Sequence, residues 1–106
     1  MSRKDNHDVG IAKNAHAIEW LKAEMVAHLG KVFRALIAAK EDVVVEVLAA
    51  LISCAYLLAR RVGVSFGRLD ARIDQHLRNN VRNDHQLETW YGDLSALLQY
   101  RDEERG

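Results

Sequence analysis

Apolar residues recur at helical spacing from about residue 15 onward. The first series has intervals of three, four, seven and four residues, and it consists of Ile18, Leu21, Met25, Val32 and Leu36. This spacing places the side chains on one face of a helix. Gly30 lies inside the series and costs about 1 kcal/mol relative to alanine in a helix. The pattern therefore predicts one long helix that bends at Gly30, or two short helices in line.

A nearly continuous apolar run follows between residues 43 and 59, and only Glu46 and Ser53 interrupt it. The three valines at its start are typical of a strand, but the run is longer than an ordinary strand and favours a helix. Two arginines and Gly63 are typical of the helix end. We expect the central helix of a bundle, buried on all sides. The alternative is a membrane span, which Glu46 and the acids before the run disfavour because their insertion is costly.

Two further helices complete the pattern. The third begins near residues 65–68, and its apolar residues are four apart: Leu69, Ile73, Leu77 and Val81. The fourth follows an expected N-cap at Asp84, and its apolar residues are Leu87, Trp90, Tyr91, Leu94, Leu97 and Leu98. Residues 1–14 show no period and predict a loose arm, and residues 101–106 predict a charged, fraying tail. The sequence thus predicts an all-α fold, a four-helix antiparallel bundle over residues 15–100.

Composition narrows the class of protein. The 106 residues fit one domain, and a hydrophobic fraction of 49% excludes a disordered chain. The lone Cys54 excludes an internal disulfide and a multi-cysteine metal site, and its apolar neighbours predict a buried, inert thiol. The N-terminal residues lack the apolar stretch of a secretory signal, so we expect a cytoplasmic protein.

The net charge is zero, with 15 basic and 15 acidic residues. This balance argues against a surface built for nucleic acid or for an anionic membrane. The charge is nevertheless segregated, because the sums are +3 over residues 1–40, −3 over 41–59, +4 over 60–83 and −4 over 84–106. We expect helices that pair by charge, with the basic third helix against the acidic fourth.

Carboxylates on the first two helices are the candidates for chemistry. Glu46 lies within the most apolar helix, so its charge needs water, a partner or a metal. Glu24 and His28 are four residues apart, as are Asp42 and Glu46, and each pair therefore shares a helix face. If the helices pack antiparallel and bring the pairs together, they form a candidate site for a divalent cation. The alternatives are a structural salt bridge for Glu46 and a solvated position for Glu24.

The third helix carries a second candidate, a row of Arg68, Arg72, His76 and Asn80 at intervals of four. Such a row suits phosphate oxygens, and the alternative is a solvated face that pairs with the fourth helix. Aromatic residues are absent from this row, which disfavours nucleic acid as a partner. Trp90, Tyr91 and Leu94 on the fourth helix are expected in core or dimer packing, with base stacking by the aromatic rings as the alternative.

Three stretches together resemble a known family: EWLKAEMVAHLGKVFRAL, EVLAALISCAYLLARRVGVSF and LDARIDQHLRNN. They are similar to the core of the MazG-like proteins among the all-α nucleoside triphosphate pyrophosphohydrolases. The segment ETWYGDLSALLQY resembles the ending of a short, divergent branch. The resemblance covers about residues 18–100. It implies a helical bundle that usually dimerises and that, in active members, uses magnesium to cleave a nucleoside triphosphate to the monophosphate and pyrophosphate.

The family signature transfers to this sequence only in part. Its Glu-x-x-Glu falls on Glu24 and Ala27, and its Glu-x-x-Asp falls on Glu46 and Ala49. The lysine and asparagine that the family places at the phosphates fall on His76 and Asn80, and we add Arg72 to this set. The resemblance thus implies Glu24 and Glu46 as catalytic metal ligands, with two of the four acids replaced by alanine.

Two functions follow from this partial signature. In the first, hydrolysis is weak or lost, or is rescued by replacement ligands from among His28, Asp42, Glu41 and Asp93. A histidine ligand would favour manganese over magnesium. In the second, the chain is a non-catalytic helical module for oligomerisation, nucleotide binding or regulation, with Trp90, Tyr91 and Leu94 at a subunit interface.

Overall fold

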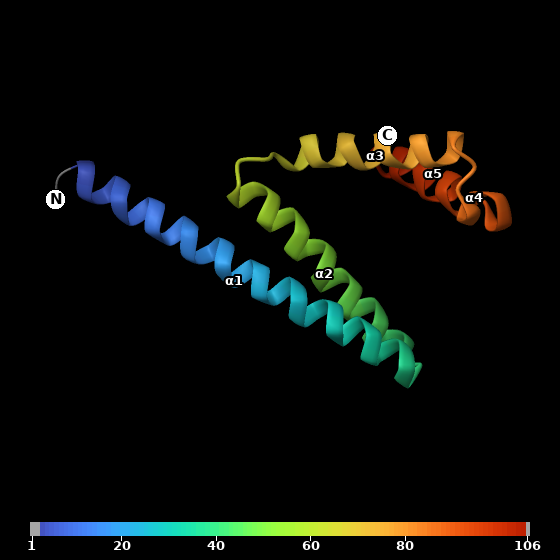
Figure 1. Ribbon diagram of the computed structural model, residues 1–106, viewed down its shortest axis with the longest axis horizontal. Helices are drawn as coiled ribbons and strands as arrows, with labels where there is room; N and C mark the ends of the chain where they lie inside the picture. The colour runs from blue at the N-terminus through green and yellow to red at the C-terminus, as the bar shows by residue number, and fades with distance from the viewer. Residues whose placement is uncertain (1–2, 106) are drawn as a thin grey trace. The chain divides into compact units, whose positions relative to one another are not determined.

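The computed structural model describes residues 3–105, and its regular structure is entirely helical over that range (Figure 1). The elements are α1 (Arg3–Ala38), α2 (Glu41–Arg61), α3 (Phe66–Arg82), α4 (Gln86–Tyr91) and α5 (Asp93–Arg105). The predicted all-α class is confirmed. The chain forms two compact units, Met1–Phe66 and Gly67–Gly106.

The first unit is an antiparallel hairpin of α1 and α2, joined by a tight turn in which Ala39 has a φ of 54°. Its core consists of Val32, Ala35 and Val47, with Val44 and Leu51 packed against them. Nearer the open end, the buried Cys54 thiol donates a hydrogen bond to the Leu21 carbonyl at 3.3 Å. The Asn14 amide donates to the Arg61 carbonyl at 3.0 Å and satisfies a group at the end of α2.

The predicted loose arm is wrong for the part of it that the structure describes, because α1 already begins at Arg3. Residues 1 and 2 lie outside the described part. Residues 8–13 are exposed, so the missing period reflects a helix that packs against nothing rather than an irregular backbone. The helix also continues through Gly30, which decides for one long helix over two short ones.

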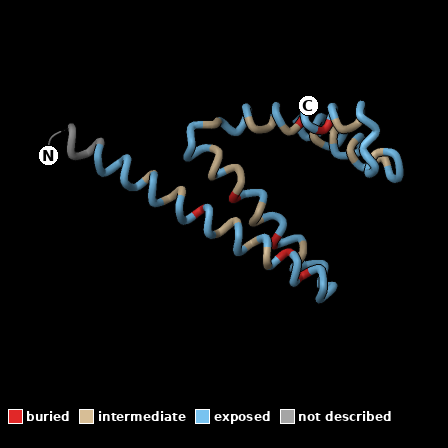
Figure 2. The backbone as a smooth tube through the Cα atoms, in the orientation of Figure 1, coloured by how far each residue is buried: buried red, intermediate tan, exposed pale blue. Residues whose placement is uncertain are grey.

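The expectation that residues 43–59 are buried on all sides is also wrong for the isolated chain. In α2 only Val47 and Cys54 are buried, whereas Val45 is 63% exposed. Figure 2 shows exposed positions along most of α2. The cause is that α1 covers a single face of this helix. By length and composition alone, α2 would be able to cross a membrane.

The second unit departs from the predicted fourth helix in two places. Asp84 lies in a left-handed turn (φ 53°), and the N-cap is instead His85, whose Nδ1 accepts the Leu87 N–H at 3.1 Å. Gly92 (φ 69°) then divides the segment into α4 and α5, so that the described chain has five helices where four were expected. Helix α5 continues to Arg105, and the described part of the expected fraying tail is therefore helical.

An ion cluster joins α3 to α5. The Arg101 Nε lies 2.6 Å from Asp74 Oδ1, and an Arg101 guanidinium nitrogen lies 3.2 Å from Asp70 Oδ1. Arg105 makes a second ion pair with Asp74. The predicted charge pairing of these helices is thus reversed in sign, because the acids belong to α3 and the arginines to α5. Asp74 is buried on the packed face of α3 beside Leu77. Because an unpaired buried carboxylate is costly, the two arginines that pair with it stabilise the folded unit.

Candidate functional site

The first unit brings Glu24 and His28 together. Both lie on the same face of α1, four residues apart, and His28 Nε2 is 3.4 Å from Glu24 Oε2. The Glu24 side chain is 36% exposed and the His28 side chain is 17% exposed. The buried Nδ1 of His28 has no hydrogen-bond partner among the described residues. Buried polar atoms in proteins usually have a hydrogen-bond partner, so this ring nitrogen is an exception.

A small cavity of about 110 Å³ adjoins the pair. Its walls come from both helices of the hairpin and consist of Trp20, Leu21, Glu24, His28, Ala50, Ser53, Cys54 and Leu57. Burial raises the pKa of the Cys54 thiol, and the charge of Glu24 raises it further. The thiol is therefore protonated at neutral pH, in keeping with the predicted buried, unreactive cysteine.

The second pair, Asp42 and Glu46, does not join the first. Both residues are exposed, and neither lines the cavity. The hydrogen bonds from Asn14 to the Arg61 carbonyl and from Cys54 to the Leu21 carbonyl fix the register of the hairpin. In this register His28 lies level with about residue 47, next to Glu46, and Glu24 lies about five residues further along α2. Antiparallel packing was the correct expectation, but Val47 takes the packed face of α2, so that Asp42 and Glu46 lie on its exposed face.

These residues do not fit a magnesium site within one chain. Within residues 3–105 no group of three or more histidine, cysteine or acidic side chains converges on a common point. Mg²⁺ demands near-octahedral oxygen coordination, and one carboxylate beside an imidazole does not supply it. The Glu24 and His28 pair has the donor set of a transition metal such as Mn²⁺, but it provides only two ligands.

The row on α3 lies in the second unit. Arg72 and His76 are exposed, Asn80 is half-buried, and its Nδ2 is 3.1 Å from His76 Nε2. The amide thereby orients the imidazole ring along the helix. The face has the cation and the donors that an anion would require.

On α4 and α5, the expected interface residues are mostly open to solvent. Trp90 and Tyr91 are exposed and meet edge to face, with ring centroids 6.4 Å apart, whereas Leu94 is half-buried. The exposure of Trp90 and Tyr91 contradicts the core packing expected as one role for them, whereas packing in a dimer stays a prediction.

Comparison with known proteins decides the family. The model of the MazG-like family matches residues 11–94, which extend from α1 into the first turn of α5. The chain belongs to the MazG-like family. No curated protein and no solved structure gives a significant match to the chain. The resemblance seen in the sequence is thus confirmed, and it relates this MazG-like chain to the nucleoside triphosphate pyrophosphohydrolases.

The MazG-like match leaves two described segments outside it, residues 3–10 and 95–105. The second of these contains Arg101 and Arg105, whose ion cluster with α3 sequence reasoning missed. A signal was present, because Asp70 and Asp74 are four residues apart, as are the two arginines. Matched spacing on two helices favours pairing across them.

Proposed function

We propose that this MazG-like chain keeps the helical scaffold of the nucleoside triphosphate pyrophosphohydrolases with a degenerate metal signature, so that hydrolysis is weak or lost. The observation that carries the proposal is the Glu24 and His28 pair at the position of the first family carboxylate. Ala27 and Ala49, which stand at two other carboxylate positions, are exposed and supply no ligand.

Any residual activity would be the cleavage of a nucleoside triphosphate to the monophosphate and pyrophosphate, with Mg²⁺ or Mn²⁺. Glu24 and Glu46 are the proposed catalytic residues and metal ligands, with His28 and Asp42 as additional ligands. Arg72, His76 and Asn80 are the proposed phosphate contacts, because they are the cation and donors of the α3 row.

The second candidate function is a non-catalytic one, in which the chain is an oligomerisation, nucleotide-binding or regulatory module. It is favoured by the apolar side chains that the hairpin leaves exposed, among them Ile37, which is 86% exposed, and Val45. An exposed apolar face of this kind is typical of a surface that a partner covers. We propose that a second copy covers it, giving a homodimer or larger oligomer with Trp90, Tyr91 and Leu94 at an interface.

The proposed setting is the cytoplasm, with a nucleoside triphosphate as the ligand and without a membrane partner. Nucleic acid is not proposed as a partner, because the chain has no net charge and the α3 row carries no aromatic residues.

The test is an assay of the pure protein with a panel of nucleoside triphosphates and either Mg²⁺ or Mn²⁺. Pyrophosphate release reports turnover, and calorimetry reports metal and nucleotide binding. We expect turnover that is weak or absent. The variant Ala27→Glu/Ala49→Asp restores the family acids and should gain metal-dependent nucleotide binding, because hard divalent cations bind more strongly as the number of carboxylate ligands rises.

A matched control is Ala23→Glu/Ala71→Asp, which adds the same charges at two other exposed alanines and should gain nothing. Robust turnover by the natural chain, lost in Glu46→Gln, would contradict the proposal of a degenerate site. Turnover that survives in Glu46→Gln would move the reaction away from these residues.

A further inference from the structure

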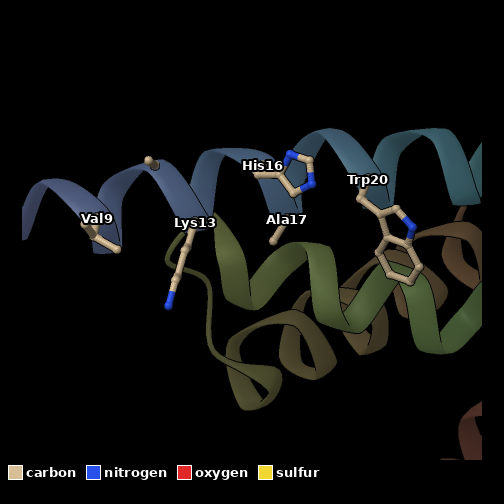
Figure 3. Close-up of a pocket in the computed structure, with 6 residues that line it drawn as sticks. Val9, Lys13, His16, Ala17 and Trp20 are labelled. Carbon is tan, nitrogen blue, oxygen red and sulfur yellow. The ribbon is translucent and has the colours of Figure 1, made fainter.

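The N-terminal half of α1 carries an apolar stripe that contains one lysine and one histidine. The stripe consists of Val9, Ala12, Lys13, His16, Ala17 and Trp20. Figure 3 shows Val9, Lys13, Ala17 and Trp20 pointing to the same side of the helix, with His16 beside them. Trp20 is 58% exposed, and Val9 is about half exposed. We refer to these six residues as the basic stripe.

The basic stripe continues into a groove between α1 and the end of α2. Ala17 and Trp20 line both, and the groove encloses about 410 Å³ with Leu21, Leu57, Arg60 and Arg61 as its other walls. The Arg60 guanidinium lies 5.4 Å from the centre of the Phe66 ring, and the Arg61 carbonyl accepts the Asn14 amide. The ring contact positions the Arg60 guanidinium, and the backbone hydrogen bond fixes the end of α2 from which Arg61 lines the groove. Glu19 lies nearby, but its carboxylate is paired with Lys22 at 2.9 Å.

Helix α5 carries a stripe of the opposite charge. Its members are separated by four, three and four residues and are Asp93, Leu97, Tyr100 and Glu104, which therefore share one face. All four are exposed, with Tyr100 at 59%. Arg101 and Arg105 fix a neighbouring face of α5 against α3, so the acidic stripe is held toward solvent. Glu103, next to Glu104, is exposed as well.

The two stripes match in length and in charge. Each spans 11 residue steps, from Val9 to Trp20 and from Asp93 to Glu104, which corresponds to about 16 Å of helix. The basic stripe and its groove contain a lysine, a histidine and two arginines, whereas the acidic stripe contains carboxylates. The basic stripe and its groove lie almost entirely within residues 11–94, the part of the chain that matches the MazG-like family, whereas Leu97, Tyr100 and Glu104 of the acidic stripe lie beyond it.

We propose that the acidic stripe of one copy docks along the basic stripe and groove of a second copy. Leu97 and Tyr100 then cover the apolar surface around Trp20, while the carboxylates meet the cations at its edge. Amphipathic helices bind grooves through anchors at this spacing, and opposite charge sets their register. This contact is separate from the proposed pairing of hairpins, which uses the apolar surface around Ile37 and Val45.

Charge reversal on the full chain tests the proposal. One variant is Lys13→Glu/Arg61→Glu, which reverses one charge in the basic stripe and one in the groove. The other is Glu103→Lys/Glu104→Lys, where the last turn of α5 tolerates cations because of the helix dipole. Sedimentation velocity over a concentration series measures association. We expect each variant alone to associate at least about tenfold more weakly than the natural chain, because like charges then meet in the contact.

Mixing the two variants in equal amounts gives the sharpest result. In the mixture both reversed stripes find a complementary partner, so association should return to the level of the natural chain. Circular dichroism checks that each variant remains helical. The control Lys31→Glu/Lys40→Glu changes the charge equally on the other half of the hairpin and should associate as the natural chain does.

Several outcomes would overturn the proposal. Variants that associate as strongly as the natural chain would exclude these stripes as the contact. A mixture that fails to restore association would exclude their pairing with each other. A natural chain whose mass equals that of the reversed variants at every concentration would show that the stripes dock within one chain or serve another protein. None of these results bears on nucleotide turnover, so failure here is distinguishable from failure of the proposed function.

Discussion

Each of the two units of this protein is stabilised internally by a different kind of interaction. In the α1 and α2 hairpin, apolar side chains such as Leu21, Val32 and Val47 are buried against one another. In the unit of α3, α4 and α5, the buried Asp74 forms ion pairs with Arg101 and Arg105. Apolar burial responds little to pH, whereas an ion cluster depends on the protonation of its carboxylates. Truncation of a buried apolar side chain should therefore destabilise the first unit, whereas acidification should destabilise the second.

The largest expected effect comes from the apolar unit. Leu21 is 5% exposed and lies against Cys54, so Leu21→Ala removes buried methyl groups and leaves a cavity beside α2. We expect a loss of about 2–4 kcal/mol in the free energy of unfolding. Urea denaturation followed by circular dichroism measures it.

The matched control is Ile11→Ala, which truncates an exposed apolar side chain on the same helix and should change stability by less than about 0.5 kcal/mol. Equal losses in the two variants would show that the hairpin core is not where the structure places it.

The second prediction concerns the ion cluster and its response to acid. The hydrogen bonds from Arg101 and Arg105 lower the pKa of Asp74 in the folded chain below its usual value of about 3.9. A carboxylate with a lowered pKa contributes stability that is present above the unfolded pKa and is lost as the pH falls through the folded pKa. We therefore expect α5 to remain docked on α3 down to about pH 4 and to detach on further acidification.

Amide hydrogen exchange measured across a pH series reports this step for each helix. Asp74→Asn should detach α5 already at neutral pH, because it leaves two arginines without their shared anion. Asp102→Asn is the control, since Asp102 pairs with Arg105 from an exposed position. If Asp74→Asn leaves the protection of α5 unchanged at pH 7, the cluster does not hold this helix.

The same contrast explains how much of the structure the sequence could predict. Periodicity identified the all-α class and the apolar helices, because apolar residues on the packed face of a helix recur at intervals of three and four residues. It missed the helix at residues 3–14, because the apolar stripe has only Val9 and Ala12 in this stretch and Lys13 follows them, too few apolar residues to show a period. It also assigned burial on every side to α2, since a single sequence does not distinguish a surface covered by its own chain from one open to a partner.

The candidate site was predictable in its parts but not in its assembly. The spacing of Glu24 and His28 correctly placed them within reach of each other. Glu46 is separated from this pair because it lies on the exposed face of α2, while the neighbouring Val47 packs in the core. The spacing of the carboxylates does not show which face of α2 packs against α1. The packed face of a helix depends on how the side chains of both helices fit together and must be observed.

The smallest expected effect tests the boundary between α4 and α5. Gly92 adopts a φ of 69°, a left-handed conformation that an alanine side chain opposes, so Gly92→Ala should destabilise the second unit by about 1 kcal/mol. Gly10→Ala should act in the opposite direction and stabilise by about 0.5–1 kcal/mol, because Gly10 lies within α1 and an added methyl group meets nothing within 4 Å. Thermal denaturation measures both. A gain in stability from Gly92→Ala would mean that the segment runs as one continuous helix, as the apolar spacing of residues 87–98 predicts, and that Gly92 does not divide it.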